Sequence, residues 1–469
     1  MTSGRRNLIL VIAVLGALSA PAGYVLWDQL LRAGEPAVYE DPEEQFKYGA
    51  LGLKAGLPTY LWAVMPEVFA DLMPHPGGWE VFGFLDEGRG YPVGFAEQTV
   101  GFPSLTPNCA LCHSGSYRTA EDADRVVVPG APAVMIDFQG FNKFLFDAAA
   151  DSRFRAAVLL PAIETRFSLG SIERMVYRYV LIPLIRRQLE KQAEEEAWMK
   201  SRPEAGRGRL DSWNLFKISI LGLPDDGSDA RCDFLPLFDQ AAQEGHYLHW
   251  NGTGNDLHQE DLMSVYPTNR GASKFLAEGF ARTRSYLHDL EPPEFPFPID
   301  EERASAGEMV YREHCAACHA PDGDQVGEVT ALAEVQTDPL YLGMWTEALV
   351  DRLESIDEGP FEFSGIRRTD GYSNVLLHGV WIQAPYLHNG SVPTLADLLE
   401  PPAQRPEVFY RGSDVYDPVA MGFVSDRPDW PLQTEYDTKV RGNSNAGHLY
   451  GTDLEPQQKQ ELLEYLKTL

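Results

Sequence analysis

The chain has 469 residues, with 39 basic and 69 acidic side chains and a formal net charge of −30 at pH 7. This negative surface repels nucleic acid, so we expect no nucleic-acid partner, and it either favours a partner with a basic surface or serves solubility alone. With 44% hydrophobic residues, the chain is long enough for two to four domains with cores of their own.

The N-terminus reads as a targeting segment over residues 1–30. Arg5 and Arg6 precede an uncharged run from Leu8 to Trp27, which as a helix spans about 30 Å, the thickness of a bilayer core. The alternative is a signal peptide cleaved near Ala20-Pro21-Ala22. Both interpretations predict export: the body lies on the periplasmic side of the cytoplasmic membrane, anchored by this segment, or free in the periplasm after cleavage.

The next segments differ in their pattern. Residues 52–101 are rich in Gly, Pro and aromatic residues without helical periodicity, which predicts irregular structure. Apolar residues at helical spacing predict helices over 137–149 and over 172–198, the second interrupted at Pro183.

Two copies of the pattern C-x-x-C-H are the strongest signal in the chain. This pattern attaches c-type haem, because the two thiols add to the vinyl groups and the adjacent imidazole becomes an axial ligand of the iron. A thioredoxin-like pair or half of a zinc site is the alternative for a single copy, but each pair here has its own His at the same offset. We therefore predict two covalently bound c-type haems, attached by Cys109, Cys112 and His113 and by Cys315, Cys318 and His319.

Three residues between the motifs remain ambiguous. Cys232 is the odd cysteine, and a buried, inert thiol is favoured over an intermolecular bridge. His249 and Trp250 lie in one short segment bounded by glycines. A Trp between two haems shortens the path of electron tunnelling, and a His there ligates iron or donates a hydrogen bond to a bound oxidant; the alternative is an aromatic corner of the core.

The C-terminal part has a clearer boundary. The proline-rich stretch 291–300 separates a predicted N-terminal c-type haem domain, 31–290, from a predicted C-terminal cytochrome c domain, 301–469. Helices are predicted over 300–314, with Asp300 as N-cap and Met309 and Val310 in apolar contacts, and over 456–468. The predicted fold is mainly α, with two cytochrome c-like haem domains, long irregular insertions and the N-terminal membrane anchor or signal segment.

The segment Gly379–Leu395, which contains Ala384-Pro385-Tyr386-Leu387-His388-Asn389-Gly390-Ser391, resembles the A-P-Y-x-H-x-G-S segment of bacterial di-haem cytochrome c peroxidases. Together with Gly442–His448 and Leu248–Trp250, it is most similar to the subgroup related to rubber oxygenase. The resemblance covers most of residues 45–469.

The resemblance implies roles for particular residues. His448 is the implied sixth ligand of the C-terminal haem, with Met421 as the rival, since His/Met ligation is common in cytochromes c. His388 is implied near the haems, Trp250 between them, and Tyr266 over the distal face of the N-terminal haem. No firm match gives that haem a sixth ligand, although His249 fills the position if Trp250 alone lies between the haems.

Three functions follow from these expectations. The first is a peroxidase-like oxidoreductase that reduces peroxide at the N-terminal haem with electrons relayed by the C-terminal haem from a redox partner with a basic surface. The alternative is an anchored electron-transfer cytochrome in which both irons have six ligands. The least favoured is a haem dioxygenase that consumes dioxygen and an apolar substrate.

Overall fold

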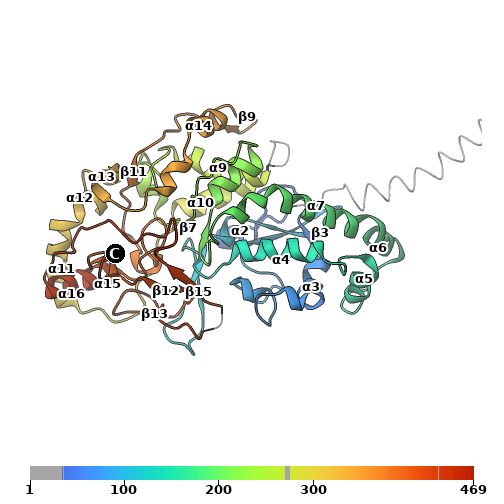
Figure 1. Ribbon diagram of the computed structural model, residues 1–469, viewed down its shortest axis with the longest axis horizontal. Helices are drawn as coiled ribbons and strands as arrows, with labels where there is room; N and C mark the ends of the chain where they lie inside the picture. Colours follow the sequence, from blue (N-terminus) through green and yellow to red (C-terminus); the bar gives the residue numbers. More distant parts are fainter. Residues whose placement is uncertain (1–33, 35, 270–274, 431) are drawn as a thin grey trace, which may run out of the picture.

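Two helices of the C-terminal region pack closely against each other. In the computed structural model, α11 (Glu301–His314) packs against α16 (Pro456–Leu466), and these two helices lie side by side in Figure 1. Asp300 caps α11 by accepting a hydrogen bond from the Arg303 amide, as predicted. At Gly307 an added Cβ would lie 1.9 Å from the Glu461 carbonyl oxygen, so only glycine permits this close helix crossing.

The structure describes residues 34, 36–269, 275–430 and 432–469. Their remaining helices begin and end at the following residues: α2 Pro42–Tyr48, α3 Thr59–Val68, α4 Phe138–Ala150, α5 Ala156–Glu164, α6 Ser171–Val176, α7 Ile182–Glu195, α8 Ser212–Asn214, α9 Leu257–Asn269, α10 Ala277–His288, α12 Ala316–His319, α13 Leu332–Val335, α14 Glu347–Glu354 and α15 Leu395–Leu398.

The expectation of a mainly α fold is wrong. About 40% of the structure is helical and 13% is in strands, which form several small antiparallel sheets. The strands are β1 Leu57–Pro58, β2 Phe95–Val100, β3 Phe102–Pro107, β4 Ser114–Tyr117, β5 Val126–Pro129, β6 Arg209–Leu210, β7 Cys232–Asp233, β8 Val329–Ala331, β9 Asp357–Glu358, β10 Phe361–Glu362, β11 Gly371–Ser373, β12 Val408–Arg411, β13 Tyr416–Asp417, β14 Gly422–Phe423 and β15 Thr434–Asp437.

The largest sheet shows why strands were missed. Its order is β1-β3-β2, and β2 and β3 form a hairpin whose turn is at Gly101, with a φ of 76°. Phe95 of β2 and Phe102 of β3 are buried. The strands are short, however, and lie among prolines and glycines, a composition that predicts irregular structure. Short strands of this kind are stabilised by packing against helix α3 rather than by a long alternating pattern.

Apolar side chains gather in separate cores. One core joins α3, α4, α5 and α7 with β2 and β3 at the end of the molecule seen on the right of Figure 1. A second core contains α11 and α16, yet it also takes Val128 and Phe238 from the N-terminal part of the chain. Val310 of α11 is buried there, whereas Met309 is 76% exposed, so the prediction that Met309 makes apolar contacts is wrong. The predicted domain boundary at 291–300 stays a prediction.

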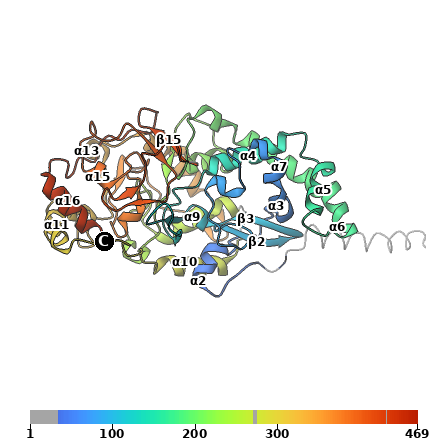
Figure 2. The same ribbon diagram turned by 90° about the horizontal axis from the view of Figure 1, so that it is seen from below.

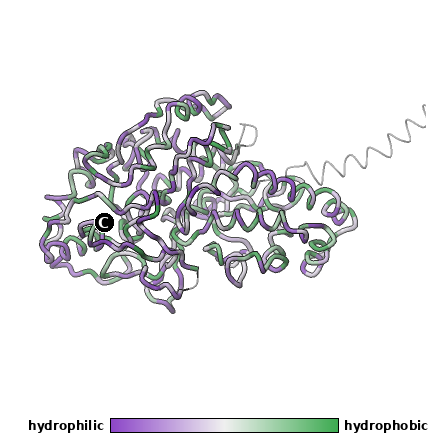
Figure 3. Tube along the Cα trace, in the orientation of Figure 1, coloured by the Kyte–Doolittle hydropathy of each residue, from purple (hydrophilic) through white to green (hydrophobic). Residues whose placement is uncertain are grey.

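The predicted anchor or signal segment, residues 1–30, lies outside the described residues. Within the described residues, no helix is both long enough and apolar enough to cross a bilayer. Figure 3 shows hydrophilic and hydrophobic positions alternating along these helices.

Candidate haem sites

The first C-x-x-C-H motif forms a tight turn directly after β3. Asn108 caps a short 3-10 helix, Cys109–Leu111, by accepting a hydrogen bond from the Ala110 amide at 3.0 Å. The turn presents His113 with its Nδ1 2.8 Å from the Leu235 carbonyl oxygen. Nδ1 therefore carries the proton and Nε2 is left as the atom for a metal. Burial lowers the pKa of His113 to about 4, so the imidazole is neutral at pH 7, as a ligand must be.

The second motif repeats this arrangement at the end of α11. Cys315 is the C-cap of α11 and the N-cap of α12, and His319 places its Nδ1 2.7 Å from the Val375 carbonyl oxygen. Burial lowers the pKa of His319 as well. Both motif histidines thus have the tautomer and the charge that c-type haem requires.

The cysteines of the motifs form no disulfides among the described residues. Burial raises the pKa of Cys109 and of Cys112 to about 12, and that of Cys315 to about 11. A catalytic C-x-x-C pair has the opposite property, a thiol pKa below its ordinary value. The raised pKa values therefore argue against disulfide exchange as the role of these pairs. Cys232 is also buried, with its thiol against the Leu210 carbonyl, as the favoured interpretation required.

His319 faces a second imidazole across a gap that fits one iron. The ring centres of His319 and His448 are 6.3 Å apart. A metal–imidazole bond of about 2.0 Å and about 1.1 Å from nitrogen to ring centre put two imidazoles on opposite sides of one metal about 6.2 Å apart. Burial lowers the pKa of His448 to about 3, and its Nδ1 has no partner among the described residues. The residues present fit a haem iron between the two rings.

Arg405 holds the loop that carries His448. Its guanidinium donates hydrogen bonds to the carbonyl oxygens of Asn445, Gly447 and His448, at 2.5, 2.9 and 3.2 Å. The His448 amide in turn bonds to the Val335 carbonyl oxygen at 2.7 Å. Gly447, with a φ of 78°, packs against the backbone at Gln336 too closely for any Cβ. The backbone that carries the imidazole is therefore held at several points.

Met421, the rival ligand, is fully buried in the core that contains Ala316, inside the second motif, and Ala320, directly after it. It has a φ of 56°, and its carbonyl oxygen accepts from the Leu395 amide and the Tyr386 hydroxyl. The ring contact of His319 is with His448, which favours the histidine as the sixth ligand.

His249 is bound to a carboxylate. Its Nε2 lies 2.7 Å from Oε2 of Glu260 on α9, and its ring packs edge-on against Trp213. It is close enough to His113 to lower the pKa of that residue. The ring contact of His113 within the described residues is with Phe234. The N-terminal site thus combines a proximal histidine with a nearby His–Glu pair.

Trp250 connects the backbone segments that hold the two proximal histidines. Its Nε1 donates to the Asp233 carbonyl oxygen at 3.1 Å, two residues before Leu235, the acceptor of His113. Its own carbonyl oxygen accepts from the Ser373 amide at 2.9 Å, two residues before Val375, the acceptor of His319. Trp250 therefore contacts both segments, and its predicted place between the two haems stays a prediction.

His388 is buried within the same region. Its ring stacks on Tyr372 with centres 4.2 Å apart, and its Nε2 lies 3.1 Å from the Tyr372 hydroxyl. Burial, with a smaller contribution from Arg209, lowers the pKa of His388 to about 3. A neutral His388 is thus coupled to a tyrosine whose hydroxyl also bonds to the Asp338 carbonyl.

Tyr266 lies on α9, in the core that also includes Trp250 and Cys109. Its ring packs against Phe216, Phe361 and Phe363, and its hydroxyl bonds to Glu358 at 3.2 Å. Its predicted place over the distal face of the first haem stays a prediction.

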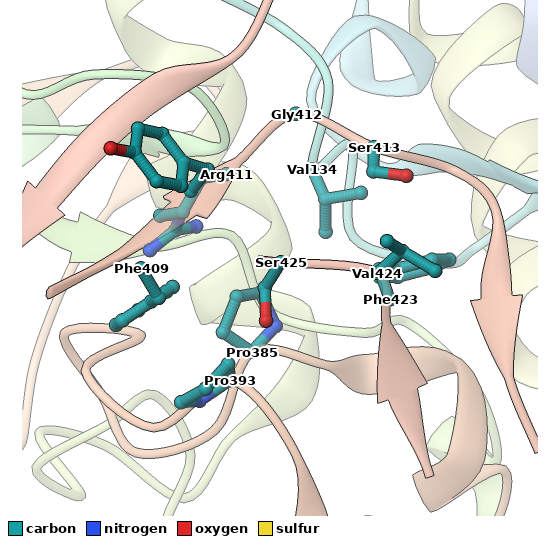
Figure 4. A pocket seen from close by; sticks show the side chains of 11 residues that line it. Val134, Pro385, Pro393, Phe409, Arg411, Gly412, Ser413, Phe423, Val424 and Ser425 are labelled. Atoms are coloured by element: carbon teal, nitrogen blue, oxygen red, sulfur yellow. The ribbon is translucent and has the colours of Figure 1, made fainter. Parts of the chain in front are cut away.

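Sequence reasoning missed Glu260, Arg405, Tyr372 and the buried ion pair of Asp233 with Arg411. Only Glu260 could have been found from the sequence. It is an acidic residue in the first turn of a helix, and it follows His249 by eleven residues. The pocket of Figure 4 has Arg411 in its wall together with Val134, Pro385, Pro393, Phe409 and Phe423. These lining residues contain none of the predicted haem ligands.

Comparison with known proteins gives a limited but specific match. Residues 371–410 match the family described as RoxA-like, cytochrome c-like, and this range contains the segment Gly379–Leu395. The uncharacterised protein y4iJ of Sinorhizobium fredii is 25% identical, over 83% of this chain and 84% of that protein. The uncharacterised protein y4iM of the same organism is 30% identical, over 44% of this chain and 54% of that protein.

A RoxA-like cytochrome c domain implies covalently bound haem, and it suggests that this chain is a haem cytochrome oxidoreductase of the RoxA-like type.

Proposed function

We propose that the protein is a di-haem c-type cytochrome that reduces peroxide at the His113 site, with electrons relayed from the His319 site. The observation that carries the proposal is the difference between the two sites: His319 faces His448 at 6.3 Å, whereas the ring contact of His113 is with Phe234. An iron with two histidine ligands stores electrons, and an iron with one open position binds a small oxidant.

The His319 site would hold its haem through Cys315, Cys318, His319 and His448. The His113 site is proposed to use Cys109, Cys112 and His113. When bound, the two irons supply the binding of peroxide and the transfer of electrons. Overall, one peroxide accepts two electrons and two protons and yields two water molecules.

The His249–Glu260 pair is proposed to move the protons. The 2.7 Å contact between Nε2 and the carboxylate fixes the orientation of the imidazole and supplies a second group that exchanges a proton with it. The packing of His249 against Trp213 limits rotation of the ring. A histidine bound in this way is available for general acid–base work, and its bond to Glu260 competes with ligation through Nε2.

Trp250 is proposed to carry electrons between the sites. Its indole donates to the segment that holds His113, and its backbone carbonyl accepts from the segment that holds His319, which supports a path through this residue. His388 and Tyr372 are proposed to pack beside this path as a neutral, mutually bonded pair.

The electron donor is proposed to be a protein with a basic surface, because the chain has a net charge of −30. Export to the periplasm is proposed from the Arg5-Arg6 pair followed by the uncharged run Leu8–Trp27. A small basic cytochrome is therefore a suitable donor in the test.

The test is steady-state reduction of hydrogen peroxide by the haem-loaded full chain, with a reduced basic cytochrome c as donor. We expect peroxide-dependent oxidation of the donor that weakens as salt screens the attraction between the two proteins. Donor oxidation that stays at the rate without enzyme, while the donor still exchanges electrons with the protein, would sink the peroxidase proposal and leave an electron carrier.

A further inference from the structure

One helical arm of the molecule exposes apolar side chains together. The arm runs from α6 through a turn of π-helix, Tyr177–Leu181, into the first half of α7. Ile172, Met175 and Tyr179 are 47%, 54% and 71% exposed, and their spacing of three and four residues puts them on one helix face. Leu184 adds a fourth exposed side chain. No other described segment gathers as many of the exposed large apolar residues.

The same arm is basic in an otherwise acidic protein. Between residues 166 and 191 there are six basic and only two acidic side chains. Arg178 and Arg187 are exposed and form no ion pair with the described residues, and Arg178 lies over the ring of Tyr179. The acids Glu194, Glu195 and Glu196 follow only at the end of α7, so charge is segregated along the helix. The basic residues are Arg166, Arg174, Arg178, Arg186, Arg187 and Lys191.

The chain enters the described fold beside this arm. The Gly34 amide bonds to the Thr99 carbonyl oxygen at 2.6 Å, at the tip of β2. In the same strand Glu97 accepts from Thr59 of α3, and the next residue, Tyr60, stacks on Tyr177 of the arm. Figure 2 shows the ends of β2 and β3 pointing to the side of the molecule where α6 lies. The 33 residues before Gly34 include the uncharged run Leu8–Trp27.

We propose that the α6–α7 arm lies on the surface of an anionic lipid bilayer, with Ile172, Met175 and Tyr179 in the headgroup region. The arm has the composition of an interfacial helix: apolar and aromatic side chains on one face and arginines beside them. Basic side chains are attracted to an anionic surface, whereas the rest of this acidic molecule is repelled. The contact orients the protein on the membrane.

The test places a nitroxide spin label on the arm of the haem-loaded full chain. Met175→Cys reports the proposed contact, and Val419→Cys, which is 80% exposed on the C-terminal region, is the matched control. The unsubstituted chain treated with the same reagent gives the background. Each protein is bound to vesicles of phosphatidylglycerol and phosphatidylcholine, and collision rates with oxygen and with a water-soluble nickel complex are measured by electron paramagnetic resonance.

We expect the label at position 175 to show a several-fold higher ratio of oxygen to nickel collisions on anionic vesicles, while the label at 419 stays aqueous. Replacing Arg178 and Arg187 by Glu should return the 175 label to water. Since all variants keep residues 1–33, the label reads the arm itself and not whether the chain binds vesicles. Equal, aqueous values at 175 and 419 would overturn the proposal. So would immobilisation of the 175 label without vesicles that grows with protein concentration, because it indicates a second copy on this face.

Discussion

The two C-x-x-C-H sites are alike on the proximal side and different on the other. In each, Nδ1 of the motif histidine bonds to a backbone carbonyl, at 2.8 Å for His113 and 2.7 Å for His319. Opposite His319 lies His448, held by Arg405. Near His113 lies His249, whose Nε2 is occupied by Glu260.

The comparison shows that each motif determines only the proximal histidine. Residues far away in sequence determine whether the iron at that site stores electrons or reacts with a substrate. His448 follows its motif by more than a hundred residues, and so does His249. An imidazole opposite the iron favours electron storage, while an imidazole bound by a carboxylate favours proton transfer.

Removing His448 should have the largest effect on the difference between the two sites. We expect His448→Ala to convert the C-terminal haem from low-spin to high-spin almost completely, because the sixth ligand is lost. Electron paramagnetic resonance of the oxidised protein measures the change. Met421→Leu is the control and should leave the spectrum intact; conversion by Met421→Leu with none by His448→Ala would reverse the ligand assignment.

The next largest effect concerns the N-terminal site. We expect Glu260→Gln to lower kcat/KM for peroxide by about 10²- to 10⁴-fold, since general acid–base catalysis contributes this much. The spin state of both haems should stay as in the parent protein. If His249→Ala instead turned a low-spin haem into a high-spin one, His249 would be an iron ligand and the difference between the sites would disappear.

A substitution at Trp250 tests whether electrons pass between the two sites through this side chain. We expect Trp250→Phe to slow peroxide turnover by roughly tenfold, or about 1.4 kcal/mol in activation free energy. Reduction potentials of the two haems should not move. Trp381→Phe is a matched control, because Trp381 is also an indole that donates to a backbone carbonyl, that of Pro293. Equal slowing in both variants would mean that Trp250 has only a structural role.

The last prediction concerns stability rather than turnover, at the link between the two regions. Asp414 accepts hydrogen bonds from Arg118 and Arg125, which follow the first motif in sequence. Burial raises the pKa of Asp414, but the two arginines outweigh it and hold the pKa below its ordinary value of 3.8. Because the folded-state pKa is lowered, the carboxylate stabilises the fold above pH 3.8, and this contribution is lost as the pH falls through the folded-state pKa.

We therefore expect Asp414→Asn to lower the free energy of unfolding by about 1.5–3 kcal/mol at pH 7 and to flatten its decline in acid. Chemical denaturation at pH 7 and in mild acid measures both effects. Asp429→Asn, which alters an exposed pair with Arg427, should change stability by less than about 0.5 kcal/mol. If Asp414→Asn lowered the free energy of unfolding no more than Asp429→Asn does, the result would contradict the proposed link between the two regions.

The sequence predicts the elements whose causes are local. The N-cap at Asp300 and helices α4, α11 and α16 follow from capping residues and apolar spacing, and the structure contains them. The RoxA-like match over 371–410 supports the resemblance read from Gly379–Leu395. The hairpin of β2 and β3 was missed because its pairing depends on a partner strand and on α3, which a window of the sequence does not display.

In the candidate site, too, local features are predictable from the sequence and contacts between distant residues are not. The Cys and His of each motif are adjacent in sequence, so their chemistry is readable there. The partners of His249 and His448, namely Glu260 and Arg405, act through single contacts made by folding, and neither residue type stands out among 69 acidic and 39 basic side chains.

The most direct test of the central claim is the electron paramagnetic resonance and optical spectrum of the haem-loaded protein, fully oxidised and half-reduced, with and without cyanide. The account predicts one low-spin haem that ignores cyanide and one haem, at the His113 site, that binds it and responds to peroxide. Two low-spin haems in both states, neither of them altered by cyanide or peroxide, would contradict the account and identify an electron carrier.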